Sequence, residues 1–438
     1  MLKYNIEKGG HNIPKLSSGG IMEIKRDIYL QKLINRMHNG MIKVITGIRR
    51  SGKSYLLFNI FRNYLKEQGV ADDHIIAIEL DMFENEKYRD PRTLLEYTKS
   101  QMTDDGDYYI FLDEVQLLPA FESVLNSFLH MHNVDVYVTG SNSKFLSKDV
   151  ITEFRGRGDE VHVYPVSFRE YMEVFDGDKY EGWSSYVSFG GLPLTITMAT
   201  DEQRMEYLTR LFEETYIKDI IERNHIEKVQ EINDLINILA SSIGSLTNTS
   251  KIEATFKSVI HSDISLNTIR AYIDHLKDAF IVNEVNRYDV KGRKYIGTPL
   301  KYYFEDVGLR NARLGFRQVE ETHLMENIIY NELRLRGYQV DVGVVVKRDR
   351  TKEGVQEKKQ LEIDFVANMG SKRYYIQSAF SLPDDEKRAQ EKASLINVND
   401  SFKKIIIVKD IVKPLYDNDG ILTMSIYDFL LNEHSLEL

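Results

Sequence analysis

The chain has 438 residues, of which 42% are hydrophobic and 28% are charged, which is typical of a folded globular protein and excludes a disordered or fibrous one. The absence of cysteine excludes disulfides, thiol catalysis and cysteine-ligated zinc, and the net charge of -10 excludes a surface that is basic throughout. No apolar run is long enough to span a bilayer, so we expect a cytoplasmic protein without a membrane partner. A chain of this length has room for about three domains of roughly 150 residues each.

The first residues, 1–21, show little hydrophobic pattern and contain glycine and serine pairs, which predicts a loose N-terminal extension. From Met22 onward, apolar runs alternate with helical patterns, and these runs lie at 41–46, 75–80, 108–112 and 134–138. Such alternation predicts an α/β fold over 22–200, in which a parallel sheet is flanked by helices.

The strongest motif follows the first apolar run and has the form GxxxxGK[ST]. In such a P-loop, glycines allow a tight turn, and backbone N–H groups and the N-terminus of the next helix face the phosphates of a nucleotide. Lys53 would reach the outer phosphates, and the Ser54 hydroxyl would bind Mg²⁺. The alternative, a glycine-rich turn without a ligand, is disfavoured because strand, loop and helix follow in the required order. The sequence therefore predicts an ATP site formed by Gly47, Ile48, Arg49, Arg50, Ser51, Gly52, Lys53 and Ser54.

Two acidic residues, Asp113 and Glu114, follow the apolar run at 108–112. Asp113 would hold Mg²⁺ and Glu114 would activate the attacking water, which together with Lys53 predicts ATP hydrolysis. An acidic pair after a strand can also be an ordinary helix cap. The polar segment 139–143 follows the next run and is predicted to place a small side chain between the acids, although turn formation alone also explains such residues.

These motifs resemble those of the AAA+ ATPases of bacteria and archaea that carry a C-terminal domain of unknown function. The resemblance begins at Arg26 and includes short segments at 112–116, 139–141, 156–157, 165–168 and 190–193. It implies that a residue called sensor 1, Ser141 or Asn142, contributes to the ATP site. It also implies a catalytic arginine at Arg157, acting in its own chain or in a partner subunit of a homo-oligomer, whereas a surface arginine is the alternative.

A helical connector at 201–226 precedes a region, 227–317, whose pattern predicts a winged helix-turn-helix. Its helices are predicted at 232–243, 250–260 and 266–279, and a hairpin then turns near 291–292. Residues 286–301 carry five basic residues and one acidic residue, an excess that suits DNA phosphates. The alternative is a winged helix that only packs against the ATPase region or a protein partner. The predicted nucleic-acid contacts are Asn267, Thr268, Arg270, Arg287, Lys291, Arg293 and Lys294.

The last region, 318–438, resembles the PD-(D/E)xK nuclease core. A helix carries Glu326 and a strand carries Asp364, but the next strand has Gln377 and Ala379 where such nucleases need an acid and a lysine. Glutamine lacks the charge of a carboxylate and alanine has no donor, so we expect this domain to be catalytically inactive.

Two classes of function follow from these patterns. The first is an ATP-hydrolysing switch or remodeller, with DNA as one target. The second is a nucleic-acid-binding or partner-binding regulator that holds ATP as a structural ligand with little turnover. Intact Lys53, Asp113 and Glu114 favour the first class, because a structural site has no need of a water-activating base.

Overall fold

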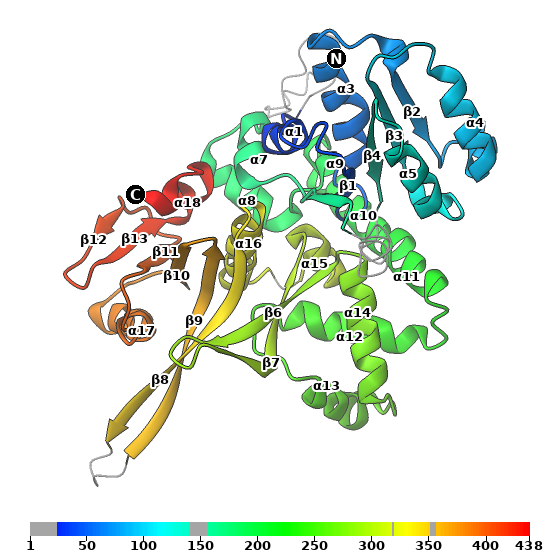
Figure 1. The fold of residues 1–438 in the computed structure, drawn as a ribbon. Helices are drawn as coiled ribbons and strands as arrows, with labels where there is room; N and C mark the ends of the chain where they lie inside the picture. The colour runs from blue at the N-terminus through cyan, green and yellow to red at the C-terminus, as the bar shows by residue number, and fades with distance from the viewer. Residues whose placement is uncertain (1–23, 141–155, 318, 351–355) are drawn as a thin grey trace, which may run out of the picture.

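The computed structural model describes residues 24–140, 156–317, 319–350 and 356–438. Its N-terminal part contains a parallel sheet with the strand order β2-β3-β4-β1-β5 (Figure 1). The strands are β1 (Ile42–Thr46), β2 (Ile75–Glu79), β3 (Tyr108–Asp113), β4 (Val134–Thr139) and β5 (Gly158–His162). This confirms the predicted α/β fold of the N-terminal region, because the four apolar runs form four of these strands. Since β4 lies between β1 and β3, the segments that follow these three strands meet at one edge of the sheet.

Helices cover both faces of this sheet. On one face, Leu94 and Phe128 pack in the same core as Ile110 of β3, and on the other face Tyr29 and Phe61 pack with Phe111. Consecutive strand residues therefore point to opposite helical layers, which explains why these buried strands are apolar throughout. The elements of this part besides the strands are α1 (Asp27–Ile34), α2 (Lys53–Tyr55), η1 (Leu56–Phe61), α3 (Arg62–Glu67), η2 (Asp72–His74), η3 (Phe83–Arg89), α4 (Pro91–Gln101), η4 (Val115–Leu117) and α5 (Phe121–Leu129).

A helical region follows the sheet and leads into a hairpin. Its first helices are α7 (Phe168–Val174), α8 (Lys179–Phe189), α9 (Pro193–Ile196), α10 (Asp201–Arg210), η6 (Leu211–Ile217) and α11 (Lys218–Arg223). Three helices then precede the hairpin in the predicted order, and the Ser265 side chain caps the third, α14, by accepting the Thr268 N–H. These elements are α12 (Val229–Ser241), α13 (Thr249–Thr255), η7 (Phe256–Ile260), α14 (Leu266–Asp278), β6 (Val282–Asp289), β7 (Lys294–Phe304) and α15 (Val307–Arg313).

The second sheet has eight strands in the order β12-β13-β11-β10-β9-β8-β6-β7. It includes the β6–β7 hairpin, because β6 pairs in parallel with β8 through Arg287, Tyr288 and Asp289. The hairpin predicted as a wing is thus the edge of the C-terminal sheet, and the predicted border at 317/318 does not separate two independent sheets. The remaining elements are α16 (Glu321–Leu335), β8 (Gln339–Arg350), β9 (Gln356–Met369), β10 (Lys372–Ala379), α17 (Asp385–Ile396), β11 (Lys403–Val408), β12 (Leu415–Tyr416), β13 (Ile421–Ser425), α18 (Ile426–Leu431) and η8 (Ser435–Glu437).

One apolar core joins the helical region to one face of the eight-stranded sheet. It contains Trp183 of α8, Tyr216 of η6, Leu309 of α15 and Phe365 of β9, and it also takes in Ile48 from the loop after β1. The P-loop is therefore packed against the region that follows the first sheet. Within the described ranges, no helix combines the length and the apolar character needed to cross a membrane.

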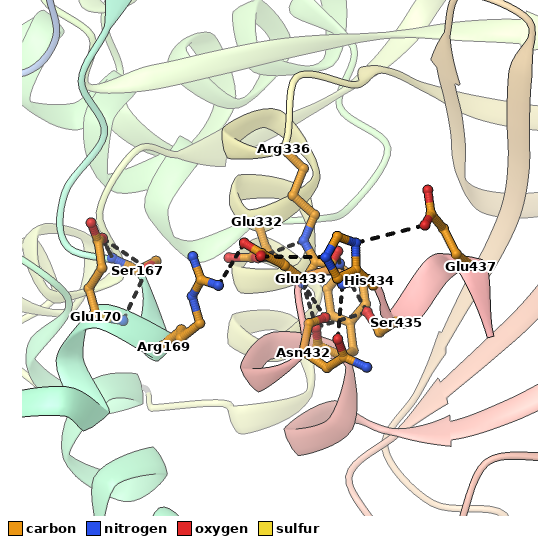
Figure 2. A network of polar contacts seen from close by, with 11 residues as sticks. Ser167, Arg169, Glu170, Glu332, Arg336, Asn432, Glu433, His434, Ser435 and Glu437 are labelled. Carbon is orange, nitrogen blue, oxygen red and sulfur yellow. Dashed lines mark hydrogen bonds and ion pairs between the residues drawn. The ribbon is translucent and has the colours of Figure 1, made fainter. Parts of the chain in front are cut away.

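A polar network fixes the C-terminal segment onto the N-terminal half (Figure 2). Arg169 of α7 forms an ion pair with Glu433 at 2.7 Å, and Arg336, just after α16, pairs with Glu332 at 2.7 Å. The Arg336 guanidinium also donates to the carbonyl oxygens of Phe429, Asn432 and Glu433. These bonds satisfy carbonyl groups at and after the end of α18, which have no partner inside the helix.

Candidate nucleotide site

The loop after β1 folds into a tight cradle that leads directly into α2. Gly47 and Gly52 have φ angles of 134° and 95°, a region that only glycine adopts without strain. A Cβ atom on Gly47 would lie 2.1 Å from the carbonyl oxygen of Val163, so glycine is also required there for space. The two glycines of the predicted motif are thus explained by the local backbone.

Lys53 lies inside this cradle with 5% of its surface exposed. Its Nζ donates to the carbonyl oxygens of Gly47 and Ile48, both at 3.0 Å. Burial lowers its pKa to about 8, and the negative charges of Glu114 and Asp113 oppose this shift. The ammonium group is therefore poorly solvated and suited to exchange its carbonyl partners for phosphate oxygens.

A second polar group in the cradle has unused hydrogen-bonding capacity. The Ser51 hydroxyl oxygen is buried and has no hydrogen-bond partner among the residues that the structure describes. Buried polar groups in proteins are nearly always hydrogen-bonded, so this hydroxyl fits a ligand that accepts or donates at the loop. Together with Lys53, it makes the loop chemically suited to a phosphate group.

The two acids predicted for catalysis are joined through Thr139 at the end of β4. The Thr139 hydroxyl donates to the Asp113 carboxylate, and the same oxygen accepts the backbone N–H of Glu114 at 3.0 Å. Burial raises the pKa of Asp113, whereas hydrogen bonds from Thr139 and Ser54 lower it. The structure thus places Asp113 and Ser54, the two predicted Mg²⁺ ligands, close to each other.

Glu114 begins the segment after β3 with a left-handed backbone, at a φ of 48°. Its carboxylate accepts a hydrogen bond from the side-chain amide of Gln116. A non-glycine residue in this conformation is uncommon and costs free energy, and such strain is often found at functional sites. Thr139 comes from the polar segment predicted to lie between the acids, whereas Ser141 and Asn142 lie outside the described residues.

Arg157 lies near the start of β1, at the opposite end of the strands from the P-loop. Its carbonyl oxygen accepts the N–H of Ile42 at 2.8 Å, at the start of β1, while the P-loop follows the end of that strand. Five strand residues span roughly 16 Å, further than an arginine side chain extends. The placement corrects the expectation that Arg157 completes the site of its own chain, and only the role in a partner subunit stays a prediction.

An apolar cavity of about 460 Å³ opens beside the P-loop at Ser51 and Gly52. The sequence does not predict this cavity, because its walls come from segments far apart in the chain. Two short segments of the family resemblance, 165–168 and 190–193, bring Val166 and Pro193 to it. The other side chains around the cavity are Ile24, Arg26, Arg50, Tyr55, Leu194, Thr197 and Tyr207.

The P-loop also contacts the helices that follow the first sheet. The Arg49 side chain forms an ion pair with Asp219 of α11 at 2.9 Å, and the Tyr216 hydroxyl donates to the Arg49 carbonyl oxygen at 2.5 Å. Tyr216 and Asp219 lie in the predicted connector, 201–226. This segment is therefore part of the nucleotide site's surroundings and not merely a link between domains.

The structure separates the predicted nucleic-acid contacts into three groups. Asn267 and Arg270 are exposed on α14 and Thr268 is partly exposed, whereas Arg287 is buried and donates to the Gln360 side chain at 3.3 Å. This corrects the prediction that Arg287 faces nucleic acid, because the hairpin is joined to the C-terminal sheet and the Arg287 side chain lies against Gln360 of β9. The three remaining predicted contacts, Lys291, Arg293 and Lys294, are exposed on the hairpin. In Figure 1 the turn of the β6–β7 hairpin lies by β9 and away from α14.

Lys301, counted in the basic excess of the hairpin, is buried among three carboxylates. Its Nζ lies 2.8 Å from Glu326, 2.8 Å from Glu362 and 3.6 Å from Asp364. Glu326 and Asp364, the two acids named for the nuclease resemblance, thus lie together, but around an ammonium group. Among the described residues, no group of three histidine or acidic side chains is arranged to hold a metal ion.

Gln377 and Ala379 face away from these acids. Along β10, Ile376 lies in the core below α16, whereas Ala379 lies in the opposite core with Leu395 of α17, and the Ser394 hydroxyl of α17 donates to Gln377. The alternation of side chains along a strand therefore places both residues on the wrong face for the predicted nuclease geometry. Their neighbours on the other face, Ile376 and Ser378, supply neither an acid nor a lysine.

The strand order of the first sheet, the P-loop and the linked acids define an ATP-binding P-loop protein of the AAA+ class. In agreement, a family model described as "AAA domain" matches residues 39–172, and one described as "Domain of unknown function (DUF8612)" matches residues 180–320. The second match covers the helical region and the β6–β7 hairpin.

Relatives extend over almost the whole chain. A protein of Haemophilus influenzae, described as uncharacterized, is 32% identical over 414 residues, which cover 93% of this chain and 98% of that protein. The chain therefore belongs to the same family as this protein. A protein of Methanocaldococcus jannaschii, also described as uncharacterized, is 27% identical over 433 residues, covering 95% of this chain and 89% of that protein. Among solved structures, a Walker-type ATPase of Pyrococcus abyssi matches 67% of this chain and 96% of its own, with 17% identity and a TM-score of 0.48.

Proposed function

We propose that this protein is a Mg²⁺-dependent ATPase that works as a nucleotide-driven switch or remodeller, with nucleic acid as its target. The observation that carries the proposal is the Thr139 hydroxyl, which links the Asp113 carboxylate to the backbone of Glu114 beside the buried Lys53. A site that only held nucleotide would need Lys53 and the loop, but not a second acid positioned for water.

Each residue has a distinct role in this reaction. Bound ATP would supply the phosphoryl group, with its Mg²⁺ neutralising charge on the outer phosphates. Lys53 would bind phosphate oxygens in place of its two carbonyl partners, and Ser54 and Asp113 would hold the metal ion. Glu114 would accept a proton from the attacking water, and Thr139 would keep both acids in place.

The apolar cavity beside Gly52 supports a nucleoside triphosphate rather than phosphate alone. It is large enough for a small-molecule site, about 460 Å³, and Tyr55, Val166 and Leu194 would contact the base. Phosphates at the loop and a base in this cavity are compatible with one bound nucleotide.

The switch role rests on contacts between the P-loop and the following region. Asp219 and Tyr216 bind Arg49 directly, and Ile48 is buried in the core shared with the eight-stranded sheet. A change in loop conformation on binding or hydrolysis would alter these contacts. Nucleotide state would thereby change how the helical region and the eight-stranded sheet are exposed to a target.

The nucleic-acid target rests on surface chemistry. Helices α12 to α14 and the β6–β7 hairpin follow the order of a winged helix-turn-helix, and Asn267 and Arg270 are exposed on its third helix. The hairpin tip adds exposed basic side chains.

Assembly into a homo-oligomer, with Arg157 acting on the ATP site of a neighbouring subunit, is a further part of the proposal. Light scattering with and without ATP tests it.

The deciding experiment compares Glu114→Gln with wild type. We expect the variant to bind ATP with unchanged affinity but to release phosphate at least 100-fold more slowly, because the amide cannot accept the proton. A fluorescent nucleotide reports binding, and a phosphate sensor reports turnover. Lys53→Ala is the contrasting variant, in which binding itself is lost.

The alternative function predicts a different result. If ATP is a structural ligand of a nucleic-acid-binding or partner-binding regulator, wild type releases no phosphate with or without DNA. In that case Glu114→Gln and wild type would behave alike in both assays, and the ATPase proposal would fail.

A further inference from the structure

A cavity of about 650 Å³ lies where three separate segments of the eight-stranded sheet meet. The tip of the β6–β7 hairpin contributes Lys291 and Arg293, the start of β10 contributes Lys372 and Arg373, and the segment before β11 contributes Phe402. The cavity exists only because the hairpin is docked onto the C-terminal sheet through β8. It is therefore a joint feature of the hairpin and the C-terminal region.

The cavity is basic in a protein that is acidic overall. Four of its lining residues are lysine or arginine and one, Asp400, is acidic. The Asp400 carboxylate already accepts the Tyr375 hydroxyl at 2.7 Å and the Phe402 N–H at 3.2 Å. Within the described residues, Lys291 and Arg293 are exposed and their side chains form no ion pair, so their charges are available to an anion.

The remaining cations are held in place by neighbours. Lys372 pairs with Glu437 at 2.6 Å, and the Arg373 Nε donates to the Asn368 side chain at 2.7 Å. The Arg373 guanidinium also lies 5.3 Å from the centre of the Phe402 ring. A fixed, planar cation against an aromatic ring is a preorganised surface rather than a mobile charge.

Phe402 gives the cavity a second kind of chemistry. It is a large apolar side chain with 40% of its surface exposed, although most such side chains avoid water. Cations beside an exposed aromatic ring match the way proteins bind single-stranded nucleic acid, in which phosphates pair with cations and bases stack on rings. In a duplex the bases are already paired and stacked, so they cannot reach such a ring.

We propose that this cavity binds single-stranded nucleic acid, with phosphates against Lys291 and Arg293 and a base against Phe402. The inference rests on the proposed function only in taking nucleic acid as the target. It differs from a winged-helix contact through α14, because the hairpin tip acts with the C-terminal sheet and away from that helix (Figure 1).

The test measures binding of a labelled oligothymidylate of about 16 nucleotides to the full chain by fluorescence anisotropy, with a duplex of equal length alongside. Phe402→Ala should weaken single-strand binding about tenfold by loss of stacking, and leave duplex binding unchanged. The double variant Lys291→Glu with Arg293→Glu should also weaken single-strand binding and reduce the salt slope by about 1.4, for two lost phosphate contacts.

A matched control reverses the charge of one arginine and one lysine at a site far from the cavity in the sequence. Arg92 and Lys99 are one arginine and one lysine, both exposed on α4 of the ATPase region, and their double change to glutamate should leave binding close to wild type. Circular dichroism melting checks that each variant is folded.

Several outcomes would overturn the inference. These are an absence of single-strand binding by wild type, unchanged binding after Phe402→Ala, an equal loss in the α4 control, or displacement of the oligonucleotide by a polyglutamate peptide at equal charge concentration. Phosphate release is measured in a separate assay, independently of oligonucleotide binding. A protein that hydrolyses ATP but ignores the oligonucleotide would refute this site and leave the ATPase proposal intact.

Discussion

Lys53 has a pKa of about 8, lowered by burial, so it loses its charge at a much lower pH than a solvated lysine. A neutral amine cannot pair with phosphate, and bound phosphate would raise this pKa again. We therefore expect ATP affinity to be nearly constant from about pH 7 to about pH 8 and to fall as the pH rises further. Titration with a fluorescent nucleotide over that range measures this fall.

The matched variant for this prediction is Lys53→Arg. Its guanidinium keeps its charge over the whole range, so its affinity, although weaker, should not change between neutral and alkaline pH. A wild-type affinity that stays flat to about pH 9.5 would contradict the lowered pKa of Lys53.

Lys301 neutralises the carboxylates of Glu326, Glu362 and Asp364, and only 3% of its surface is exposed. In Lys301→Met these acids would be left without a counter-charge. We expect a loss of about 3–5 kcal/mol in the free energy of unfolding at neutral pH, measured with denaturant.

The pH dependence of that variant has a defined sign. Burial raises the pKa of Asp364 above its unfolded value, and loss of the ammonium raises it further. The raised pKa disfavours the charged acids in the folded variant, so the destabilisation grows as the pH rises above the unfolded pKa of these carboxyls and is lost as the pH falls to that value. Lys294→Met is the control, because Lys294 is exposed on the same strand, β7. Equal stability of the two variants at neutral pH would contradict this account.

At the scale of elements, Arg336 and Arg169 make contacts of different kinds in the network of Figure 2. Arg336 is 8% exposed and binds carbonyl oxygens at and after the end of α18, whereas the Arg169–Glu433 pair is partly exposed at both ends. We expect Arg336→Ala to cost about 2–4 kcal/mol and Arg169→Ala less than about 1 kcal/mol.

Hydrogen exchange distinguishes the two variants further. In Arg336→Ala the amides of α18 should exchange faster, because the helix end loses its partners while Glu332 keeps a buried charge. Protection in the first sheet should be unchanged. A loss confined to the global melting temperature, with α18 as protected as in wild type, would contradict a local role for Arg336.

At the scale of the whole molecule, the ion pair between Arg49 and Asp219 joins the P-loop to α11. If nucleotide state is transmitted by this contact, ATP and nucleic acid each change the affinity for the other by the same factor. Asp219→Asn should bring that factor close to one, while both ligands still bind. Titrating each ligand with and without the other measures it.

Glu222→Gln is the matched control for this coupling. Glu222 lies on the same helix, and in the part of the chain that the structure describes its side chain pairs only with Lys218, at 3.9 Å, so its loss should leave the coupling unchanged. A coupling factor reduced equally in both variants would mean that α11 acts through its general charge and not through Arg49.

The sequence by itself was enough to predict the nucleotide site. Gly47, Gly52 and Lys53 are close in the chain, and the acids Asp113 and Glu114 follow a buried strand, so local pattern was enough to place their chemistry. The parallel sheet was equally predictable, since strands buried on both faces are continuous apolar runs.

Only the tertiary structure decided where the charges of the C-terminal half lie. Arg287 and Lys301 had the pattern of an exposed wing, but pairing of β6 with β8 joins the hairpin to the C-terminal sheet, where side chains of β9 and α16 cover them. The position of Arg157 depends equally on its neighbour β1. Strand partners distant in the chain leave no mark in local composition, and their pairing sets which side chains meet water. The same long-range pairing assembles the basic cavity around Phe402, which no local pattern indicates.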